Sequence, residues 1–250
     1  MNTYIITGAS KGIGLALSKL LLAEGNQLVC VARTINEELL SEAKEKNCPL
    51  TFLQADLSNT QDVELLMTKI RKELLEAPTS VALINNAGMI DPIGRVEDNP
   101  AELIDKSISV NLIAPMILCS AFIRTFENVT IEKKIINISS GAGRNPTTGW
   151  SSYCAGKAGL DHFTRVVAAE QQNIPFGVKA ISIAPGIIDT GMQETIRSAT
   201  KDDFEELDRF IQFKAQGMLS TPEQTAQKLV QLMESPKFSE LEPILDIRSL

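Results

Sequence analysis

The stretch that decides the fold is TGASKGIG, residues 7–14, which directly follows the apolar run TYIIT at residues 3–7. It carries glycine at positions 8, 12 and 14. Glycine accepts backbone angles and close approaches that a side chain prevents. If a helix begins near Gly12, its N-terminus attracts a phosphate group. Such glycines also serve purely structural turns, but their place between a strand and a helix favours nucleotide binding.

Apolar runs and helical patterns alternate along the rest of the chain. The runs are almost continuously apolar, as expected for parallel strands buried on both faces. They are TYIIT, QLVCVA, LTFLQA, VALIN, KIINIS and VKAISIA. Helical periodicity covers residues 13–24, 37–46, 61–75, 101–126 and 152–171. This alternation predicts an α/β fold, with one doubly wound Rossmann-type parallel sheet, helices on both faces and a single domain over residues 1–250.

The C-terminal third predicts three further elements. A helix should begin at STPEQTAQKLVQLM, with Ser220 or Thr221 as its N-cap and Pro222 in its first turn. The segment ILDI should form a short last strand. Residues 191–217 are polar and charged with weak strand character, which favours a helical flap over a site.

Composition excludes several classes of protein. The chain has 250 residues, of which 44% are hydrophobic and 22% charged, enough for a sizeable core. A net charge of −7 argues against a nucleic-acid partner. No segment approaches the unbroken apolar run of a membrane span, and the N-terminus lacks the features of a signal peptide. We therefore expect a cytoplasmic protein with no membrane partner.

Cysteine and histidine usage predicts no metal site. The single histidine, His162, cannot supply a cluster, and the four cysteines form no C-x-x-C pair. They are Cys30, Cys48, Cys119 and Cys154. We expect reduced thiols, mostly buried as small apolar groups.

The end of the second predicted strand, VARTIN, lacks an acidic residue. An acid there would bond the ribose hydroxyls and select NAD. Instead Arg33 follows the strand, the first acid is Glu37, and Lys11 lies in the glycine turn. Two cations can hold a 2′-phosphate, so we predict NADPH/NADP+ as the cofactor. A solvated Arg33 without a ligand is the alternative.

The stretch SSYCAGKAGLDHF, residues 151–163, places Tyr153 and Lys157 four residues apart. On a helix these two side chains share a face. A free phenol has a pKa of about 10, and a nearby ammonium lowers that value. The phenol could then give a proton to a carbonyl oxygen. Pairs at this spacing are also common in purely structural helices.

Two polar positions accompany this pair. NISS, residues 137–140, ends the fifth predicted strand, where ligands bind in such sheets, and a serine hydroxyl there can stabilise developing negative charge. Asn111 lies inside a predicted helix, four residues before Pro115. Because proline has no N–H, the carbonyl of Asn111 loses its helical donor and could bind water.

These motifs together resemble the short-chain dehydrogenase/reductase family over essentially the whole chain. The resemblance rests on the G-x-x-x-G-x-G turn, NNAG at residues 85–88, Asn111, Tyr153 and Lys157. The family's serine-to-tyrosine spacing favours Ser140 over Ser139. The resemblance implies that Asn111, Ser140, Tyr153 and Lys157 are catalytic. It also implies that Asn111 helps to hold a water molecule, from which a proton returns to the tyrosine through the lysine.

The resemblance also implies the cofactor contacts. Asp56 would meet the adenine amine, and the loop PGIIDTG, residues 185–191, would flank the nicotinamide. The full set of implied cofactor-binding residues is Gly8, Ser10, Lys11, Gly12, Ile13, Gly14, Arg33, Thr34, Asp56, Leu57, Asn86, Ala87, Gly88, Asn111, Tyr153, Lys157, Pro185, Gly186, Ile188 and Thr190.

Within the family, the chain resembles the sepiapterin reductase branch in the segments GWSSYCAGKA and APGIIDTGMQ. Enzymes of that branch reduce pterin side-chain carbonyls. Their bacterial relatives reduce one carbonyl of an aromatic 1,2-diketone such as benzil. The resemblance implies a small-molecule carbonyl substrate, with Asp246 placed to hold a pterin ring. A charged residue near a free end is the alternative for Asp246. Other expected substrate contacts are Ser140, Gly141, Ala142, Trp150, Tyr153, Met192 and the flap.

Three questions stay open at this point. Trp150 could be a packing residue instead of a pocket residue. The family commonly pairs subunits through helices matching residues 101–126 and 152–171, which implies a homodimer, with a tetramer as the alternative. A regulator that senses NADP(H) without chemistry is the alternative to a reductase, and the intact serine, tyrosine and lysine favour the enzyme.

Overall fold

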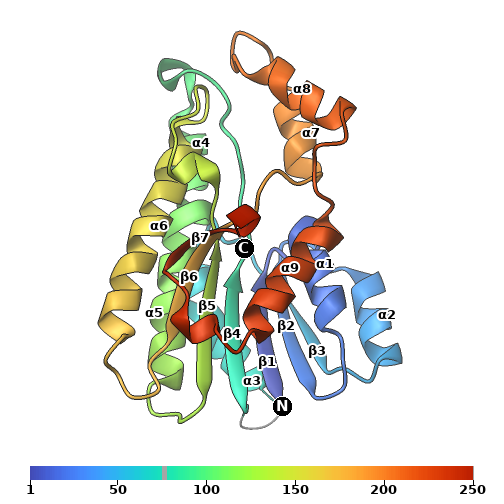
Figure 1. The fold of residues 1–250 in the computed structure, drawn as a ribbon, viewed down its shortest axis with the longest axis vertical. Coiled ribbons are helices and arrows are strands. Elements are labelled where there is room, and N and C mark those ends of the chain that lie inside the picture. The colour runs from blue at the N-terminus through green and yellow to red at the C-terminus, as the bar shows by residue number, and fades with distance from the viewer. Residues whose placement is uncertain (75–77, 250) are drawn as a thin grey trace.

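The computed structural model describes residues 1–74 and 78–249, and it contains the predicted parallel sheet (Figure 1). Its seven strands lie in the order β3-β2-β1-β4-β5-β6-β7, and every neighbouring pair is parallel. They are β1 (Asn2–Thr7), β2 (Asn26–Ala32), β3 (Leu50–Gln54), β4 (Ser80–Asn85), β5 (Glu132–Ile138), β6 (Lys179–Ala184) and β7 (Ile244–Asp246). The doubly wound α/β class is confirmed.

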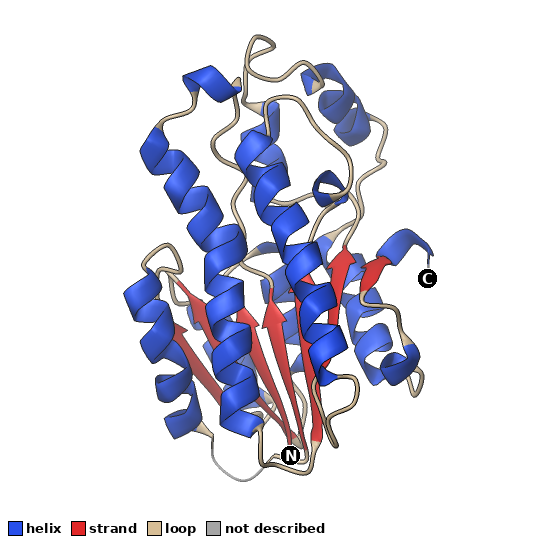
Figure 2. Cartoon of the chain, turned by 90° about the vertical axis from the view of Figure 1, so that its left-hand side faces the viewer, coloured by secondary structure: helices blue, strands red, loops and turns tan. Residues whose placement is uncertain are grey.

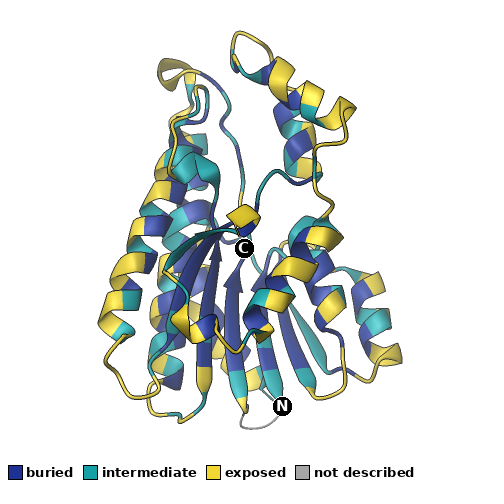
Figure 3. Ribbon diagram, in the orientation of Figure 1, coloured by how far each residue is buried: buried dark blue, intermediate teal, exposed yellow. Residues whose placement is uncertain are grey.

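Helices cover both faces of this sheet (Figure 2). One layer contains α1 (Gly12–Leu21), α2 (Glu37–Glu45) and α9 (Pro222–Glu234). The other contains α3 (Thr60–Glu73), α4 (Ala101–Ile108), α5 (Ala114–Phe126) and α6 (Ser151–Gln171). Alternate residues of each strand point to opposite faces. Ile6 therefore packs with the α1 and α9 layer, whereas Ile5 packs with α3 and α5. In Figure 3 the strands are accordingly the most continuously buried part.

The strand order reverses between β1 and β4, and this reversal opens a crevice at the carboxyl ends of the strands. Thr7, the last residue of β1, ties the two strands together there. Its Oγ1 accepts hydrogen bonds from the backbone N–H groups of Asn86 and Ala87 at 3.0 and 3.1 Å. The Asn86 side chain donates to the Thr7 carbonyl at 2.9 Å. The glycine turn and the NNAG segment thus meet at the switch point.

The predicted helix over residues 101–126 is interrupted by a π-helical turn, Ser109–Ile113. Pro115 cannot donate to the carbonyl of Asn111, so the regular i to i−4 ladder cannot continue through this turn. The N–H of Ala114 instead bonds the carbonyl of Ser109, five residues back. The prediction of one regular helix is therefore wrong at this turn, in which Asn111 is fully buried. That the Asn111 carbonyl is free to bind water stays a prediction.

The same helical run contradicts the expectation that no segment approaches a membrane span. By length and composition alone, Ala101–Phe126 is long and apolar enough to cross a membrane, with a mean hydropathy of 1.6 over an 18-residue window. Buried Ser107, Ser109 and Asn111 interrupt the apolar run, but the average hydropathy of the helix is still high. In this fold the run packs against α3 and α6 as a core helix.

Other boundaries differ from prediction by a few residues. α1 ends at Leu21, three residues before the predicted end, because Leu22 has extended backbone angles. α3 ends at Glu73, and the predicted helix end at position 75 lies outside the described residues. α9 begins at Pro222 as predicted, and its cap is Thr221, paired with Gln224 in a capping box.

Short elements complete the chain. Residues 191–217 contain α7 (Gly191–Arg197) and α8 (Leu207–Ala215), which stand beyond the carboxyl ends of the strands (Figure 1). Single 3₁₀ turns occupy Val96–Asp98, Gly141–Gly143, Phe238–Glu240 and Ile247–Ser249. All four cysteines are free thiols. His162 is exposed on α6.

Candidate active site

A cavity of about 1200 Å³ runs along the carboxyl ends of the strands, from Arg33 at one end to Trp150 at the other. It is roomier than a pocket for one drug-sized ligand and can hold a dinucleotide with a substrate. Most of the predicted cofactor residues line it. Gly14, Asn111 and Asp246 are the predicted site residues that do not.

The glycine turn is shaped to receive a phosphate group. Gly8 and Gly12 have φ values of +69° and +58°, which favour glycine. A Cβ at Gly14 would lie 2.3 Å from the Gly8 carbonyl oxygen, so a side chain there would push α1 away from the turn. Gly14 therefore shapes the turn from behind. The N-terminus of α1 faces the cavity through Gly12, where an anion is favoured.

Cations surround the cavity near the end of β2. Lys11 and Arg33 both line it and are exposed, as the sequence suggested. Lys106 of α4 joins them and was not predicted, because it comes from a distant helix. The pKa of Asp56 is lowered, chiefly by a hydrogen bond from the Ser58 N–H and further by the charges of Arg33 and Lys106. This end of the cavity suits an anionic nucleotide group.

Tyr153 and Lys157 lie in the middle of the cavity on one face of α6. Both are buried, at 6% and 4% exposure. The Lys157 Nζ donates to the carbonyl of Ile138, the last residue of β5, at 2.9 Å. The same Nζ lies 5.8 Å from the centre of the Tyr153 ring. The helix thus delivers both groups to the end of the sheet, as the four-residue spacing predicted.

The ionisation of Tyr153 differs from the sequence expectation. Burial raises the pKa of the phenol, and a hydrogen bond with Ser140 only partly opposes this. The ammonium of Lys157 is directed at the Ile138 carbonyl, so it does not dominate the phenol as expected. Burial also lowers the pKa of Lys157, to about 8. In this protein the desolvation of both groups outweighs their mutual attraction.

Ser140 stands beside this pair, and both Ser139 and Ser140 line the cavity. The Ser140 hydroxyl interacts with the Tyr153 phenol and accepts a hydrogen bond from the Ala142 N–H at 3.1 Å. Ser139 is 3% exposed, and its hydroxyl has no partner among the described residues. The geometry therefore favours Ser140 as the serine that can reach a ligand.

The Asn111 side chain holds the segment that follows NNAG. Its amide donates to the Met89 carbonyl at 2.8 Å, and its Oδ1 accepts from the Met89 N–H at 3.2 Å. Gly88 passes so close that a Cβ there would lie 3.6 Å from the Lys157 Nζ. Asn111 thus positions the wall beside Lys157. Its water-holding role stays a prediction.

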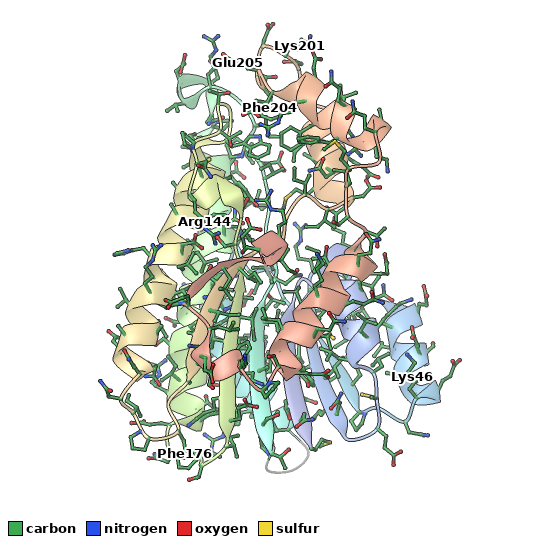
Figure 4. All side chains as sticks on the ribbon, in the orientation of Figure 1. Lys46, Arg144, Phe176, Lys201, Phe204 and Glu205 are labelled. Atoms are coloured by element: carbon green, nitrogen blue, oxygen red, sulfur yellow. The ribbon has the colours of Figure 1, made fainter. Side chains whose placement is uncertain are left out.

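Aromatic rings form the end of the cavity at which substrate contacts are predicted. Trp150 stacks on Phe204 with centroids 5.0 Å apart, and its edge meets Tyr153 at 5.9 Å and Phe210 at 5.3 Å. Phe204, labelled in Figure 4, belongs to the segment between α7 and α8. Trp150 is therefore a packing residue that also lines the cavity. Phe210 and Phe213 of α8 line it too and were missed, although their spacing of three residues marks one helix face.

Asp246 is engaged by another residue. Its carboxylate accepts two hydrogen bonds from the Arg248 guanidinium, at 2.9 and 2.6 Å, and this pairing lowers the pKa of Asp246. Arg248, not Asp246, lines the cavity, with its side chain beside Gly186. The ring-holding role of Asp246 remains a prediction, and Arg248 is a cavity residue that the sequence analysis missed.

The cavity, the glycine turn and the buried tyrosine–lysine pair are consistent with the predicted nucleotide-dependent oxidoreductase. A family model described as "short chain dehydrogenase" matches residues 2–201. The chain belongs to the short-chain dehydrogenase family, whose members use NAD(P)(H), and it is an oxidoreductase acting on CH–OH or C=O groups.

Individual proteins similar to this chain indicate a narrower class of reaction than the family alone. The chain is 39% identical to a Bacillus cereus benzil reductase ((S)-benzoin forming) over 98% of both sequences. It is 31% identical to rat sepiapterin reductase, covering 94% of this chain and 92% of the relative. Among solved structures, the KRED1-Pglu enzyme matches with a TM-score of 0.83 and 27% identity, over 98% of this chain and 100% of the other. These similarities support a carbonyl reductase.

Replacing Lys157 by methionine tests the cost of burying its ammonium. Because the pKa falls from 10.5 to about 8 on folding, the cost is fully present below pH 8 and is relieved as the pH rises towards 10.5. Relative to K157M, the wild type should therefore gain about 2 kcal/mol of unfolding free energy between about pH 7 and 9.5. Denaturant unfolding at several pH values measures this difference.

The matched control is Lys228→Met, which removes an exposed lysine on α9. Its stability curve should run parallel to that of the wild type across the same pH range. If the K157M curve also ran parallel to the wild type, Lys157 would not be desolvated as described.

Proposed function

We propose that this chain is an NADPH-dependent carbonyl reductase that reduces one carbonyl of an aromatic 1,2-diketone, such as benzil, to a hydroxyketone. The observation that carries the proposal is the group formed by half-buried Ser140 and buried Tyr153 and Lys157, which line a cavity with an aromatic wall. Identity of 39% and 38% to two Bacillus benzil reductases over nearly the whole chain supports the substrate class.

In the proposed reaction, NADPH supplies a hydride to the carbonyl carbon. Tyr153 donates its phenolic proton to the carbonyl oxygen. The phenol is protonated at neutral pH and can donate this proton, although burial raises its pKa and makes it a weaker acid. The Ser140 hydroxyl donates a second hydrogen bond to that oxygen. The Lys157 ammonium stabilises the tyrosinate that remains and binds the nicotinamide ribose.

The shape of the substrate end supports a planar aromatic ketone. Trp150, Phe210 and Phe213 offer apolar faces, and the flap formed by residues 191–217 would close over the substrate. Gly141, Ala142 and Met192 line the same region. A pterin side-chain carbonyl is the second candidate, supported by the similarity to sepiapterin reductases. Family membership and these relatives favour an enzyme over a regulator that only senses the nucleotide.

Removing one hydroxyl tests the role of Tyr153. Tyr153→Phe should lower the rate of NADPH oxidation with benzil by at least about a hundredfold, because the proton donor is lost. NADPH binding, followed by its fluorescence, should stay within about threefold because the ring remains in place. The chain's other tyrosine, Tyr4 of β1, provides the control. Tyr4→Phe should keep full turnover, and full turnover in Tyr153→Phe would refute the mechanism.

We infer that Lys11 and Arg33 select NADPH by binding its 2′-phosphate. Each charge-assisted contact is worth about 1.5–3 kcal/mol. Arg33→Ala should therefore raise the KM for NADPH by about tenfold or more and leave the KM for NADH nearly unchanged. Arg95, which is exposed and outside the cavity lining, is the control. Equal effects on both cofactors would contradict this assignment.

We also infer a homodimer formed through α4, α5 and α6. Ile104, Met116 and Val166 leave apolar surface exposed on these helices. Light scattering should give twice the chain mass of 27.3 kDa, and a mass of one chain would contradict the dimer. The four free thiols fit a reducing compartment such as the cytoplasm.

A further inference from the structure

Arg144 joins three elements next to the Ser140 hydroxyl. It directly follows the 3₁₀ turn Gly141–Gly143, which Ser140 caps. Its Nε donates to the Asp161 carboxylate of α6 at 3.0 Å, and one of its terminal nitrogens donates to the Leu245 carbonyl of β7 at 2.8 Å. Its side chain is 27% exposed, so most of it is covered. Figure 4 labels Arg144 between α6 and the C-terminal segment.

Asp161 is a buried carboxylate whose two oxygens are both satisfied. One oxygen accepts from Arg144, and the other accepts from the Ser182 hydroxyl of β6 at 2.6 Å. Asp161 is only 3% exposed, so its charge needs these partners. It follows Lys157 by four residues on α6, which puts it one turn from the ammonium.

The Ser140 turn lies directly on the backbone of Lys157. A Cβ at Gly143 would be 2.8 Å from the Lys157 carbonyl carbon and 2.9 Å from its oxygen. The turn therefore cannot move closer to the backbone of α6 on this side. On the other side, the bond from Arg144 to Asp161 fastens it to the next turn of the same helix.

We propose that Arg144 and Asp161 are positioning residues that clamp the Ser140 turn onto α6. The clamp would fix the Ser140 hydroxyl against the Tyr153 phenol, and this proposal rests on the proposed reductase function. Neither residue touches the substrate. A displacement of about 1 Å at reacting groups can cost about a hundredfold in rate. The clamp therefore matters for turnover more than for cofactor binding.

Asp161 has a second effect, on the charge of Lys157. The charged or titratable groups that face Lys157 are Tyr153 and Asp161 from its own helix, with Arg144 behind Asp161. Asn111 and Gly88 approach from the other side and carry no charge. The negative charge of Asp161 raises the pKa of Lys157 and opposes the effect of burial. Asp161 thus helps to keep the ammonium protonated.

Four full-length variants separate positioning from mere stability. Arg144→Met removes the clamp and leaves Asp161 unpaired. Asp161→Asn removes the charge and keeps the shape. The double variant Arg144→Met/Asp161→Asn removes the clamp without leaving a buried charge, so it should fold. Ser182→Ala is the control, because it removes one hydrogen bond to Asp161 and keeps both charges.

The first readout is NADPH oxidation with benzil. The double variant should lose about tenfold to a hundredfold in kcat, with the KM for NADPH within about twofold of the wild type. Ser182→Ala should keep kcat within about threefold. Wild-type kcat in a stably folded double variant would overturn the positioning role.

The second readout does not depend on turnover. In protein labelled with 13C at lysine Cε, the Lys157 resonance is assigned by its loss in Lys157→Met, and its titration is followed by NMR. Asp161→Asn should move the titration to lower pH, whereas Arg144→Met should move it to higher pH. An unmoved titration in Asp161→Asn would overturn the electrostatic role. If the wild type reduced no diketone, the proposed substrate would fail while this titration still tested the pair.

Discussion

The site depends on one energetically unfavourable feature, the burial of the Lys157 ammonium at the carboxyl end of β5. An unpaired buried charge is strongly unfavourable. The Ile138 carbonyl and the neighbouring Asp161 charge reduce that cost, but the pKa still falls to about 8. To reach Ile138, α6 must lie close to its neighbours, and its glycines allow this. A Cβ at Gly159 would lie 2.9 Å from the Leu112 side chain.

The same burial shapes the chemistry of Tyr153. Burial raises the pKa of the phenol, so it holds its proton at neutral pH but is a weaker acid than a free phenol. In the proposed reaction, the ammonium on the same helix face would stabilise the tyrosinate that remains after proton donation. In this view Lys157 acts most strongly after the proton has moved. Trp150 stacks on Phe204 and meets Phe210 and Tyr153 edge-on, so an apolar wall lies beside the phenol.

Features encoded by local patterns could be predicted from the sequence. The parallel strands follow from apolar runs, the start of α9 from Thr221 and Pro222, and the shared face of Tyr153 and Lys157 from their spacing. The missing helical donor to the Asn111 carbonyl follows from Pro115, whereas the π-helical form of the turn was not predicted. Each of these depends on residues close together in the chain.

Features created by tertiary contact could not be predicted. Asp161 lies 17 residues from Arg144, and Leu245 lies 101 residues from it, so no pattern links them. The raised pKa of Tyr153 depends on burial by the segment that carries Phe204 and Phe210. The sequence shows opposite charges at Asp246 and Arg248, two residues apart. It does not show which of these two side chains lines the cavity.

The most direct test of the account is a crystal structure of the protein with NADP+ and benzoin. The account predicts that the alcohol oxygen lies about 3 Å from both the Ser140 hydroxyl and the Tyr153 phenol, with the nicotinamide ribose bonded to the Lys157 ammonium. A product bound elsewhere in the cavity, or a nicotinamide far from Lys157, would contradict it.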